Sequence, residues 1–122
     1  KRTDNKAHIS RLVHADLMLD CFICGAHTTC AEALRAELPV VTLIGKVFYS
    51  RVAASILTAA KMESCITHTK EAFINRAIEI AKNPEILTEL KNHLIENKNT
   101  LPIFDQKKWV KDFESTLIGL VK

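Results

Sequence analysis

The sequence has little glycine, little proline and few aromatic residues: 3 Gly, 3 Pro and 6% Phe, Trp and Tyr in 122 residues. Collagen-like chains and low-complexity disordered chains are rich in Gly and Pro, so this composition excludes both classes. Long hydrophobic runs are also missing, and no stretch approaches the ~20 apolar residues of a transmembrane helix. The sequence therefore predicts no membrane span. We find neither a signal peptide nor an initiating Met, and the start at Lys1 predicts a piece of a longer protein.

The chain also lacks a strong excess of charge of one sign. It carries 17 Lys and Arg against 14 Asp and Glu, which gives a formal charge of +3. The lysines are scattered over predicted outer helix faces, so we expect no nucleic-acid partner. A hydrophobic share of 48% and a charged share of 25% are typical of a globular chain. The length predicts one domain over residues 1–122.

Cysteine is sparse and clustered, with Cys21, Cys24 and Cys30 close together and Cys65 apart. This is not the pattern of a secreted disulfide framework, so free thiols and a cytoplasmic location are expected. The spacing Cys21-x-x-Cys24-x-x-His27-x-x-Cys30 also resembles a zinc box. Side chains at the end of a strand and inside a helix have fixed directions that hardly allow four ligands to form one tetrahedron, so we expect no metal. A small zinc module and a Cys–His nucleophile remain alternatives.

Strand and helix patterns alternate along the chain. The expected strands are Ala15–Asp20, Pro39–Ile44 and Ser64–Thr67, and the expected helices are Lys6–His14, Thr28–Glu37, Tyr49–Met62, Thr69–Lys82, Pro84 to about Asn97, and Gln106–Val121. This alternation implies βαβ crossovers. The fold class is therefore α/β, a partial Rossmann-like parallel sheet of about three strands flanked by helices. Three strands are few, so we expect an incomplete sheet or an edge covered by other protein.

Several side chains receive individual predictions. Helical spacing predicts that the last helix faces the core through its large apolar residues, namely Trp109, Phe113, Leu117 and Leu120. We expect His14 to pack and His68 and His93 to be solvated. Arg51 opens a helix after a glycine loop, where it either approaches an anion or has a structural role.

The stretch from Leu17 to Leu34 organises the chain, because it combines a buried strand, a tight turn and a helix start. Small residues at Gly25 and Ala26 precede Thr28 and Thr29. Such a turn aims free backbone N–H groups and the positive helix end at one point, which suits a phosphate. Thr29-Cys-Ala-Glu32 is also a capping box, which is the structural alternative.

Four blocks resemble one known family. They are Ala15-Asp-Leu-Met-Leu-Asp20, Ala26-His-Thr-Thr29, Leu38-Pro-Val-Val-Thr42 and Ser50-Arg-Val-Ala-Ala-Ser55. In order and spacing they resemble the C-terminal end of the O-linked N-acetylglucosamine transferases, including SPINDLY-type proteins with tetratricopeptide repeats. The resemblance covers nearly the whole chain. It implies a glycosyltransferase of the GT-B fold, of which this chain is the later part of the C-terminal, donor-binding half.

The resemblance also implies roles for particular residues. His27, Thr28 and Thr29 are expected to hold the donor diphosphate at the helix start. Glu32 matches a position that is usually Asp and contacts the ribose, and His8 is expected near the nucleobase. Lys6 and Arg11 are possible neighbours of the site, and Gly45 matches a glycine loop near the donor. No metal cofactor is expected, and catalytic residues are expected upstream of this chain.

The sequence departs from the family pattern at three places. Glu37 stands where a glycine is common and removes an easy helix C-cap. Lys46 stands where an acidic or other polar residue is common, and Ala60-Lys61 replaces a Leu-Gly ending. We expect the fold to survive these changes, whereas activity and sugar choice are less secure.

Together these observations predict the donor-binding part of a glycosyltransferase that moves a sugar, such as N-acetylglucosamine, from a UDP-sugar to protein Ser or Thr. The alternative is a non-catalytic α/β interaction module with a degenerate nucleotide pocket. A UDP-sugar and a protein acceptor are the expected partners. Apolar surface left by the missing half is expected to favour self-association of the fragment, and the fragment alone is expected to be inactive.

Overall fold

The computed structural model of the protein describes residues 4–121. Its strands are β1 (Met18–Leu19), β2 (Val40–Leu43) and β3 (Ile66–Thr67). Its α-helices are α1 (Asn5–Leu12), α2 (Thr28–Arg35), α3 (Val52–Ala59), α4 (Lys70–Lys82), α5 (Pro84–Glu96) and α6 (Gln106–Leu120). Two short 3₁₀ helices, η1 (Phe48–Ser50) and η2 (Glu63–Cys65), precede α3 and β3.

The three strands form one parallel sheet in the order β1-β2-β3. Met18 of β1 aligns with Val40 of β2, and Thr42 of β2 aligns with Ile66 of β3. Each crossover carries a helix, as parallel strands require. The predicted fold class, a three-stranded parallel sheet flanked by helices, is confirmed.

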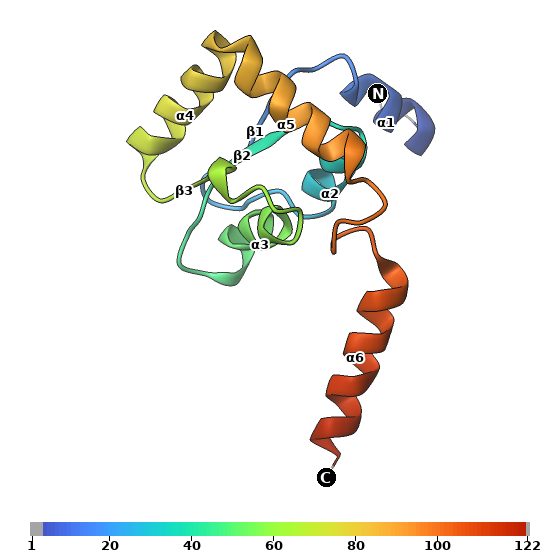
Figure 1. Ribbon diagram of the computed structural model, residues 1–122. Coiled ribbons are helices and arrows are strands. Elements are labelled where there is room, and N and C mark those ends of the chain that lie inside the picture. The colour runs from blue at the N-terminus through green and yellow to red at the C-terminus, as the bar shows by residue number, and fades with distance from the viewer. Residues whose placement is uncertain (1–3, 122) are drawn as a thin grey trace.

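Helices cover both faces of the central strand. Helices α2 and α3 pack against each other and both contact β2, while α4 contacts β2 and β3 and packs against α5. Figure 1 shows the strands between α4 and α3, with α1 at the side of α2. Large, fully buried apolar side chains come from these layers and from the connections beside them: Leu34, Val40, Val41, Leu57, Met62, Ile80, Leu94 and Leu101. The β-branched residues of β2 are buried because helices shield the strand on both faces.

The elements begin and end where their local chemistry allows. Asp4 caps α1 by accepting the Ala7 N–H at 2.8 Å, and Thr69 caps α4 by accepting the Ala72 N–H at 3.0 Å. Pro84 begins α5 at a position where a missing N–H has no cost. The predicted helix over Tyr49–Met62 is too long, because residues 48–51 form η1 and a turn before α3 begins.

Two residues stand where the family pattern has a glycine at the end of a helix, and both adopt a left-handed backbone conformation. Glu37 has φ 63° and Lys61 has φ 55°. After α2, the Leu38 N–H donates to the Ala33 carbonyl at 2.9 Å, which is a Schellman-type helix ending. The expected survival of the fold is therefore borne out at Glu37, whose carboxylate also pairs with Lys98 at 2.8 Å.

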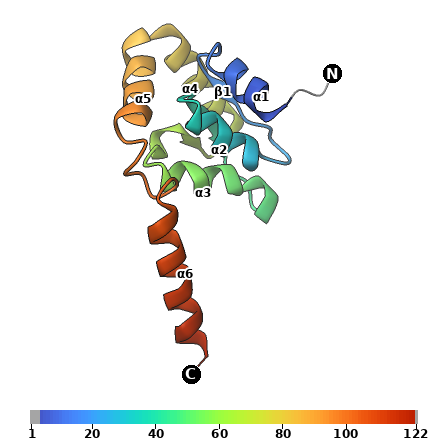
Figure 2. The ribbon, with the colours of Figure 1, turned by 90° about the vertical axis from the view of Figure 1, so that its right-hand side faces the viewer.

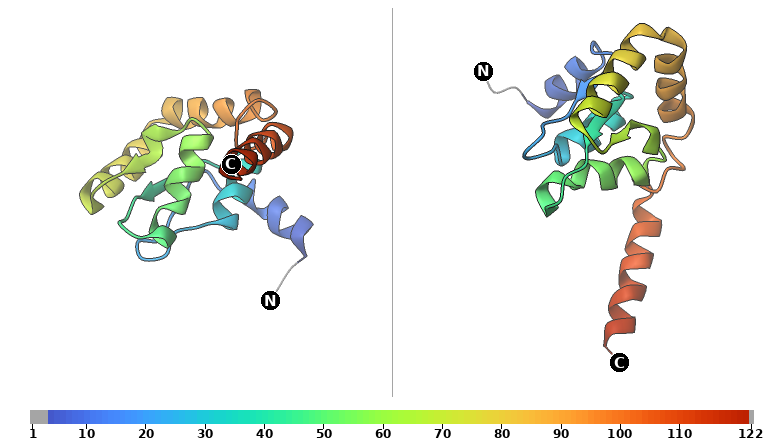
Figure 3. Two further views of the ribbon diagram at one scale, coloured as in Figure 1. Left: turned by 90° about the horizontal axis from the view of Figure 1, so that it is seen from below. Right: turned by 90° about the vertical axis from the view of Figure 1, so that its left-hand side faces the viewer.

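The prediction that α6 faces the core is wrong within the described chain. Figures 1 and 2 show α6 projecting away from the sheet and the other helices. The view from below in Figure 3 looks along this projecting helix from its C-terminal end. Trp109 is 61% exposed and Leu120 is 75% exposed. Helical periodicity identified the apolar face correctly, but periodicity says nothing about whether a partner lies opposite that face.

Two histidine predictions are also wrong. His14 is exposed rather than packed, because it lies in the turn that follows α1. His93 is half-buried, and its Nε2 lies 2.8 Å from the Ala60 carbonyl oxygen at the end of α3. His68 is exposed, as expected. Among residues 4–121, no helix has the length and hydrophobicity needed to span a bilayer.

Candidate functional site

The carboxyl ends of β1 and β2 open into two loops that lie side by side. Residues 20–27 join β1 to α2, and residues 44–51 join β2 to α3. The Tyr49 carbonyl accepts the Gly25 N–H at 3.0 Å and lies 3.3 Å from His27 Nε2. The start of α2 therefore sits at the carboxyl edge of the sheet, which is where parallel α/β sheets bind ligands.

Asp20 builds the first loop. Its side chain is 7% exposed, and Oδ1 accepts the N–H groups of Cys21 at 2.7 Å and Ala26 at 2.6 Å. Its Oδ2 accepts the Thr42 hydroxyl at 2.6 Å, which ties the loop to β2. A Cβ on Gly25 would approach Asp20 Oδ2 to 3.0 Å, so a small residue is needed there for space. One buried carboxylate thus fixes both ends of the loop before α2.

Helix α2 begins without a side-chain cap. Its N-cap residue is His27, whose side chain makes no capping hydrogen bond. Thr28 and Thr29 are exposed, and their N–H groups have no acceptor within the helix, whereas the Cys30 N–H already donates to the His27 carbonyl at 3.1 Å. The capping-box alternative is wrong, because Thr29 lies inside the helix and Glu32 contacts another element. An uncapped helix start with adjacent hydroxyls can bind an anion.

Glu32 and His8 connect α2 to α1. The Glu32 Oε2 lies 3.2 Å from His8 Nε2, and His8 Nδ1 lies 2.8 Å from Arg11 Nη2. Glu32 and His8 are half-buried, with side-chain exposures of 26% and 24%. The structure therefore brings these two predicted site residues together on neighbouring helices. Each keeps part of its surface open to solvent.

The cysteines near the site differ in burial. Cys30 is fully buried, and burial together with the Asp20 charge raises the pKa of its thiol to about 12. Cys21 and Cys24 are exposed free thiols. Within residues 4–121, no group of three His, Cys, Asp or Glu side chains is arranged to hold a metal ion. The zinc alternative on Cys21, Cys24, His27 and Cys30 therefore has no structural support.

The second loop is fixed by contacts within itself. The Ser50 hydroxyl donates to the Val47 carbonyl at 2.9 Å, and the Gly45 N–H donates to the Ser50 carbonyl at 2.9 Å. A Cβ on Gly45 would collide with the Ser50 side chain, which explains the glycine. Arg51 Nη1 donates to the Gly45 carbonyl at 3.0 Å. The structural role proposed for Arg51 is thus observed.

Sequence reasoning missed Asp20 and the Tyr49 carbonyl as the groups that shape the site. A carboxylate directly after a strand was a usable pattern, because a buried charge needs several hydrogen-bond donors and Asp20 is 7% exposed. The predicted burial of the strand itself is wrong at Leu19 of β1, which is 53% exposed. The contact of the Tyr49 carbonyl could not be predicted from residue types, because it is made by the backbone. Among the expected site residues, His27, Thr28 and Thr29 share one edge, and Glu32 lies one turn further along α2.

These features define a class of protein. A parallel sheet with an open helix start at its carboxyl edge is the architecture of α/β domains that bind phosphate-bearing ligands. The sequence profile of glycosyl transferase family 41 matches residues 3–113. The chain belongs to glycosyl transferase family 41.

Individual relatives agree with this membership. The chain is 35% identical over 108 residues to a probable UDP-N-acetylglucosamine–peptide N-acetylglucosaminyltransferase SEC of Arabidopsis thaliana, covering 88% of this chain and 11% of that protein. It is 28% identical over 111 residues to a probable SPINDLY transferase of Solanum lycopersicum, covering 91% of this chain and 12% of that protein. The chain thus spans about a tenth of the length of these curated relatives.

A solved structure shares the fold. The chain is similar to a mutant O-GlcNAc transferase of Thermobaculum terrenum with a TM-score of 0.89 and 25% sequence identity. The match covers 94% of this chain and 22% of that chain. The resemblance inferred from the four sequence blocks is confirmed. The fold corresponds to part of a GT-B glycosyltransferase.

Proposed function

We propose that this chain is the donor-binding portion of a glycosyltransferase that transfers a sugar, N-acetylglucosamine, from a UDP-sugar to Ser or Thr of a protein. One observation carries the proposal: α2 starts uncapped at the carboxyl edge, beside the exposed Thr28 and Thr29. The N–H groups of Cys21, Gly25 and Ala26 already have acceptors. We assign the donor diphosphate to the first turn of α2, where the Thr28 and Thr29 N–H groups have no acceptor within the helix.

Catalytic assistance from this half would be electrostatic. The leaving diphosphate gains negative charge as the glycosidic bond breaks, and preorganised N–H groups stabilise such charge. His27 is tethered to the Tyr49 carbonyl, so its ring lies at the same edge as the α2 start. Glu32 is assigned to the ribose hydroxyls and His8 to the nucleobase. No metal is assigned, and the catalytic residues are assigned to protein upstream of this chain.

The same proposal covers partners and location. A UDP-sugar and an acceptor protein are the assigned partners, and the reaction is placed in the cytoplasm. Self-association of the 122-residue chain is assigned to the exposed apolar face of α6. The interaction-module alternative rests on the changes at Glu37 and Lys46. Glu37 completes the α2 ending and pairs with Lys98, which removes one of its two grounds, while Lys46 is exposed.

The test is an NMR titration of this chain with UDP, with ADP as the nucleobase control. We expect UDP-selective shifts at the amides of Thr28, Thr29 and Glu32. Thr28→Ala removes one hydroxyl at the helix start and should weaken UDP binding about tenfold or more, since a hydrogen bond to a charged group contributes about 1.5–3 kcal/mol and about 1.4 kcal/mol is tenfold in Kd. Thr116→Ala is the matched control, because Thr116 lies on the distant α6. Equal binding by Thr28→Ala and the parent chain would remove Thr28 from the site.

A further inference from the structure

Five large apolar side chains are exposed on the two loops at the carboxyl edge of the sheet, one of which, Phe22, also packs edge to face on Phe73 of α4. Phe22 and Ile23 lie on the first loop and are 44% and 81% exposed. Val47, Phe48 and Tyr49 lie on the second loop and are 47%, 77% and 47% exposed. We call these five residues the apolar rim. Grouped apolar side chains at a surface are typical of interaction sites, whereas scattered ones need no explanation.

The apolar rim is continuous with the candidate site. The His27 and Phe48 rings meet edge to face, with centroids 6.1 Å apart. The Tyr49 carbonyl contacts both Gly25 and His27. A molecule seated on Phe48 is therefore adjacent to the group that the proposed function places at the donor diphosphate.

Chemistry indicates which molecule that is. In a sugar-transfer reaction the acceptor must reach the carbon that is bonded to the leaving diphosphate. The proposed function assigns the nucleobase of the donor to His8 on α1 and its charged diphosphate to the start of α2, so neither part is assigned to the five exposed apolar side chains. The acceptor is the remaining reactant at this end, so the apolar rim fits an acceptor segment with apolar side chains.

The charges around the apolar rim are positive. Lys46 is exposed directly before Val47, and Lys70 Nζ lies 5.7 Å from the centroid of the Phe22 ring. In the described part of the chain neither lysine forms an ion pair. The nearest acidic neighbour along the chain is Glu71, beside Lys70, and the Asp20 carboxylate is buried and already accepts three donors. The surface therefore favours an acidic partner.

We propose that the apolar rim, with Lys46 and Lys70, binds the acceptor protein and selects segments that carry an apolar residue and an acidic residue close to the acceptor Ser or Thr. This inference rests on the proposed function and adds to it a specificity for the acceptor. Lys46 sets the charge preference, and Phe48 provides the apolar contact beside His27.

The test is an NMR titration of the 122-residue chain with two synthetic peptides. One is acetyl-Glu-Leu-Thr-Phe-Glu-amide, and the other replaces both Glu by Lys. We expect the acidic peptide to shift the Phe48 and Tyr49 amides with a Kd at least threefold lower than that of the basic peptide. Absence of binding by the acidic peptide, or equal binding of both peptides, overturns the proposal.

Two pairs of variants separate the apolar rim from general effects. Lys46→Glu should abolish or reverse the charge preference, whereas Lys82→Glu makes the same charge change at the far end of α4 and should keep it. Phe48→Ser should weaken acidic-peptide binding at least threefold. Ile95→Ser, at a 51% exposed position on α5, should leave it unchanged. Equal effects within either pair contradict the proposal.

Two further readouts complete the experiment. If the Phe48 and Tyr49 amides shift on dilution of the chain without peptide, a second copy occupies the apolar rim and the proposal is wrong. A parallel UDP titration distinguishes the two proposals. UDP binding without a peptide preference refutes only the acceptor inference, whereas a peptide preference without UDP binding refutes the donor assignment and leaves a peptide-binding surface.

Discussion

The loop before α2 and the helix α6 are both surface segments, but different interactions hold them. The loop at residues 20–27 has no regular structure, yet Asp20 ties it to its own backbone and to Thr42 of β2. Helix α6 is fully regular, yet every residue from 106 to 121 is exposed. Regular structure and tertiary anchoring are therefore separate properties in this chain.

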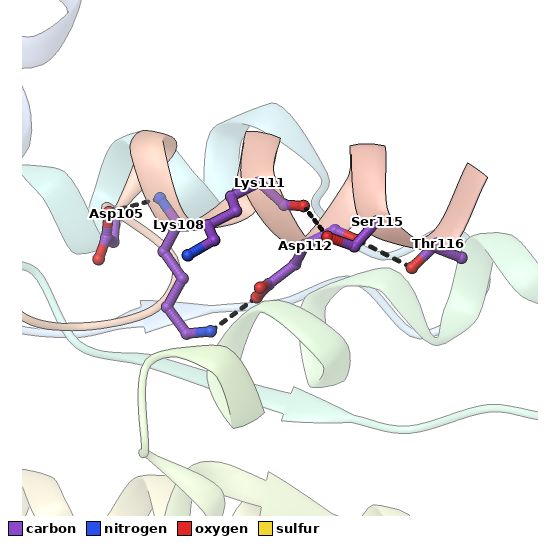
Figure 4. A network of polar contacts seen from close by, with 6 residues as sticks. All are labelled: Asp105, Lys108, Lys111, Asp112, Ser115 and Thr116. Carbon is purple, nitrogen blue, oxygen red and sulfur yellow. Dashed lines mark hydrogen bonds and ion pairs between the residues drawn. The ribbon is translucent and has the colours of Figure 1, made fainter. Parts of the chain in front are cut away.

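The polar contacts of α6 are local. Lys108 Nζ lies 2.7 Å from Asp112 Oδ2, and the Ser115 and Thr116 hydroxyls donate to the Lys111 and Asp112 carbonyls one turn earlier (Figure 4). The Trp109 and Phe113 rings stack on the apolar side with centroids 5.1 Å apart. Exposed pairs of this kind contribute only tenths of a kcal/mol each. The comparison teaches that α6 follows from local sequence, whereas the loop depends on the packed sheet.

The largest expected difference in the free energy of unfolding is between a leucine of the packed core and a leucine of α6. Leu57 on α3 is fully buried, and Leu57→Ala should lower the free energy of unfolding by about 3 kcal/mol, because it leaves a cavity. Leu117 on α6 is 46% exposed, and Leu117→Ala should cost less than about 1 kcal/mol. Urea denaturation followed by circular dichroism measures both. Similar losses would show that α6 is covered in solution.

The next difference concerns the two aspartates. Asp20→Ala leaves the N–H groups of Cys21 and Ala26 and the Thr42 hydroxyl without their acceptor, and should cost about 2–3 kcal/mol. Asp112→Ala removes an exposed pair and should change stability by less than about 0.5 kcal/mol. The same denaturation experiment compares them.

Asp20→Asn provides a second variant where Asp20→Ala does not fold. Its amide oxygen can still accept both N–H groups, so the loop should form and stability should recover in part. Equal instability of the Asn and Ala variants would show that the negative charge, rather than the acceptor oxygens, holds the loop. A loss for Asp112→Ala as large as for Asp20→Ala would contradict the contrast.

The smallest expected difference is a pH effect. The Cys30 thiol has a pKa raised from 9.0 to about 12, so above pH 9 the unfolded chain releases a proton that the folded chain keeps. Stability should therefore fall as pH rises from 9 to 12, by about 1 kcal/mol between pH 8 and pH 10. Chemical denaturation at these two pH values measures the fall.

Two variants isolate the contribution of Cys30. Cys30→Ala should show a fall smaller by about 1 kcal/mol, since the titrating thiol is gone. Lys108 also has a raised pKa, caused by Asp112, but it is fully exposed. Lys108→Gln should therefore keep the parent pH dependence. An unchanged fall in Cys30→Ala would show that the thiol does not link folding to pH.

Much of the fold could be predicted from residue patterns. The β-branched run in β2 predicts a buried parallel strand, and the four sequence blocks predict the family correctly. The expected site residues His8 and Glu32 meet at 3.2 Å between Nε2 and Oε2, although no pattern predicted this contact. Their roles toward a donor stay predictions, as do those of Thr28 and Thr29.

The failures share a physical cause. The apolar stripe of α6 and the position of His14 were interpreted as packing, but a pattern specifies which face is apolar and not what covers it. The capping box failed because Glu32 pairs with His8 on α1, a contact between residues far apart in sequence.

The sequence by itself determined the order of elements, the helix starts at Thr69 and Pro84, and the family, because these depend on local hydrogen bonds and residue order. Tertiary structure alone decided that Asp20 shapes the loop before α2 and that α6 stands free of the core. The donors to a buried carboxylate and the side chains that cover an apolar helix face come from segments that are distant in sequence, so both depend on tertiary packing.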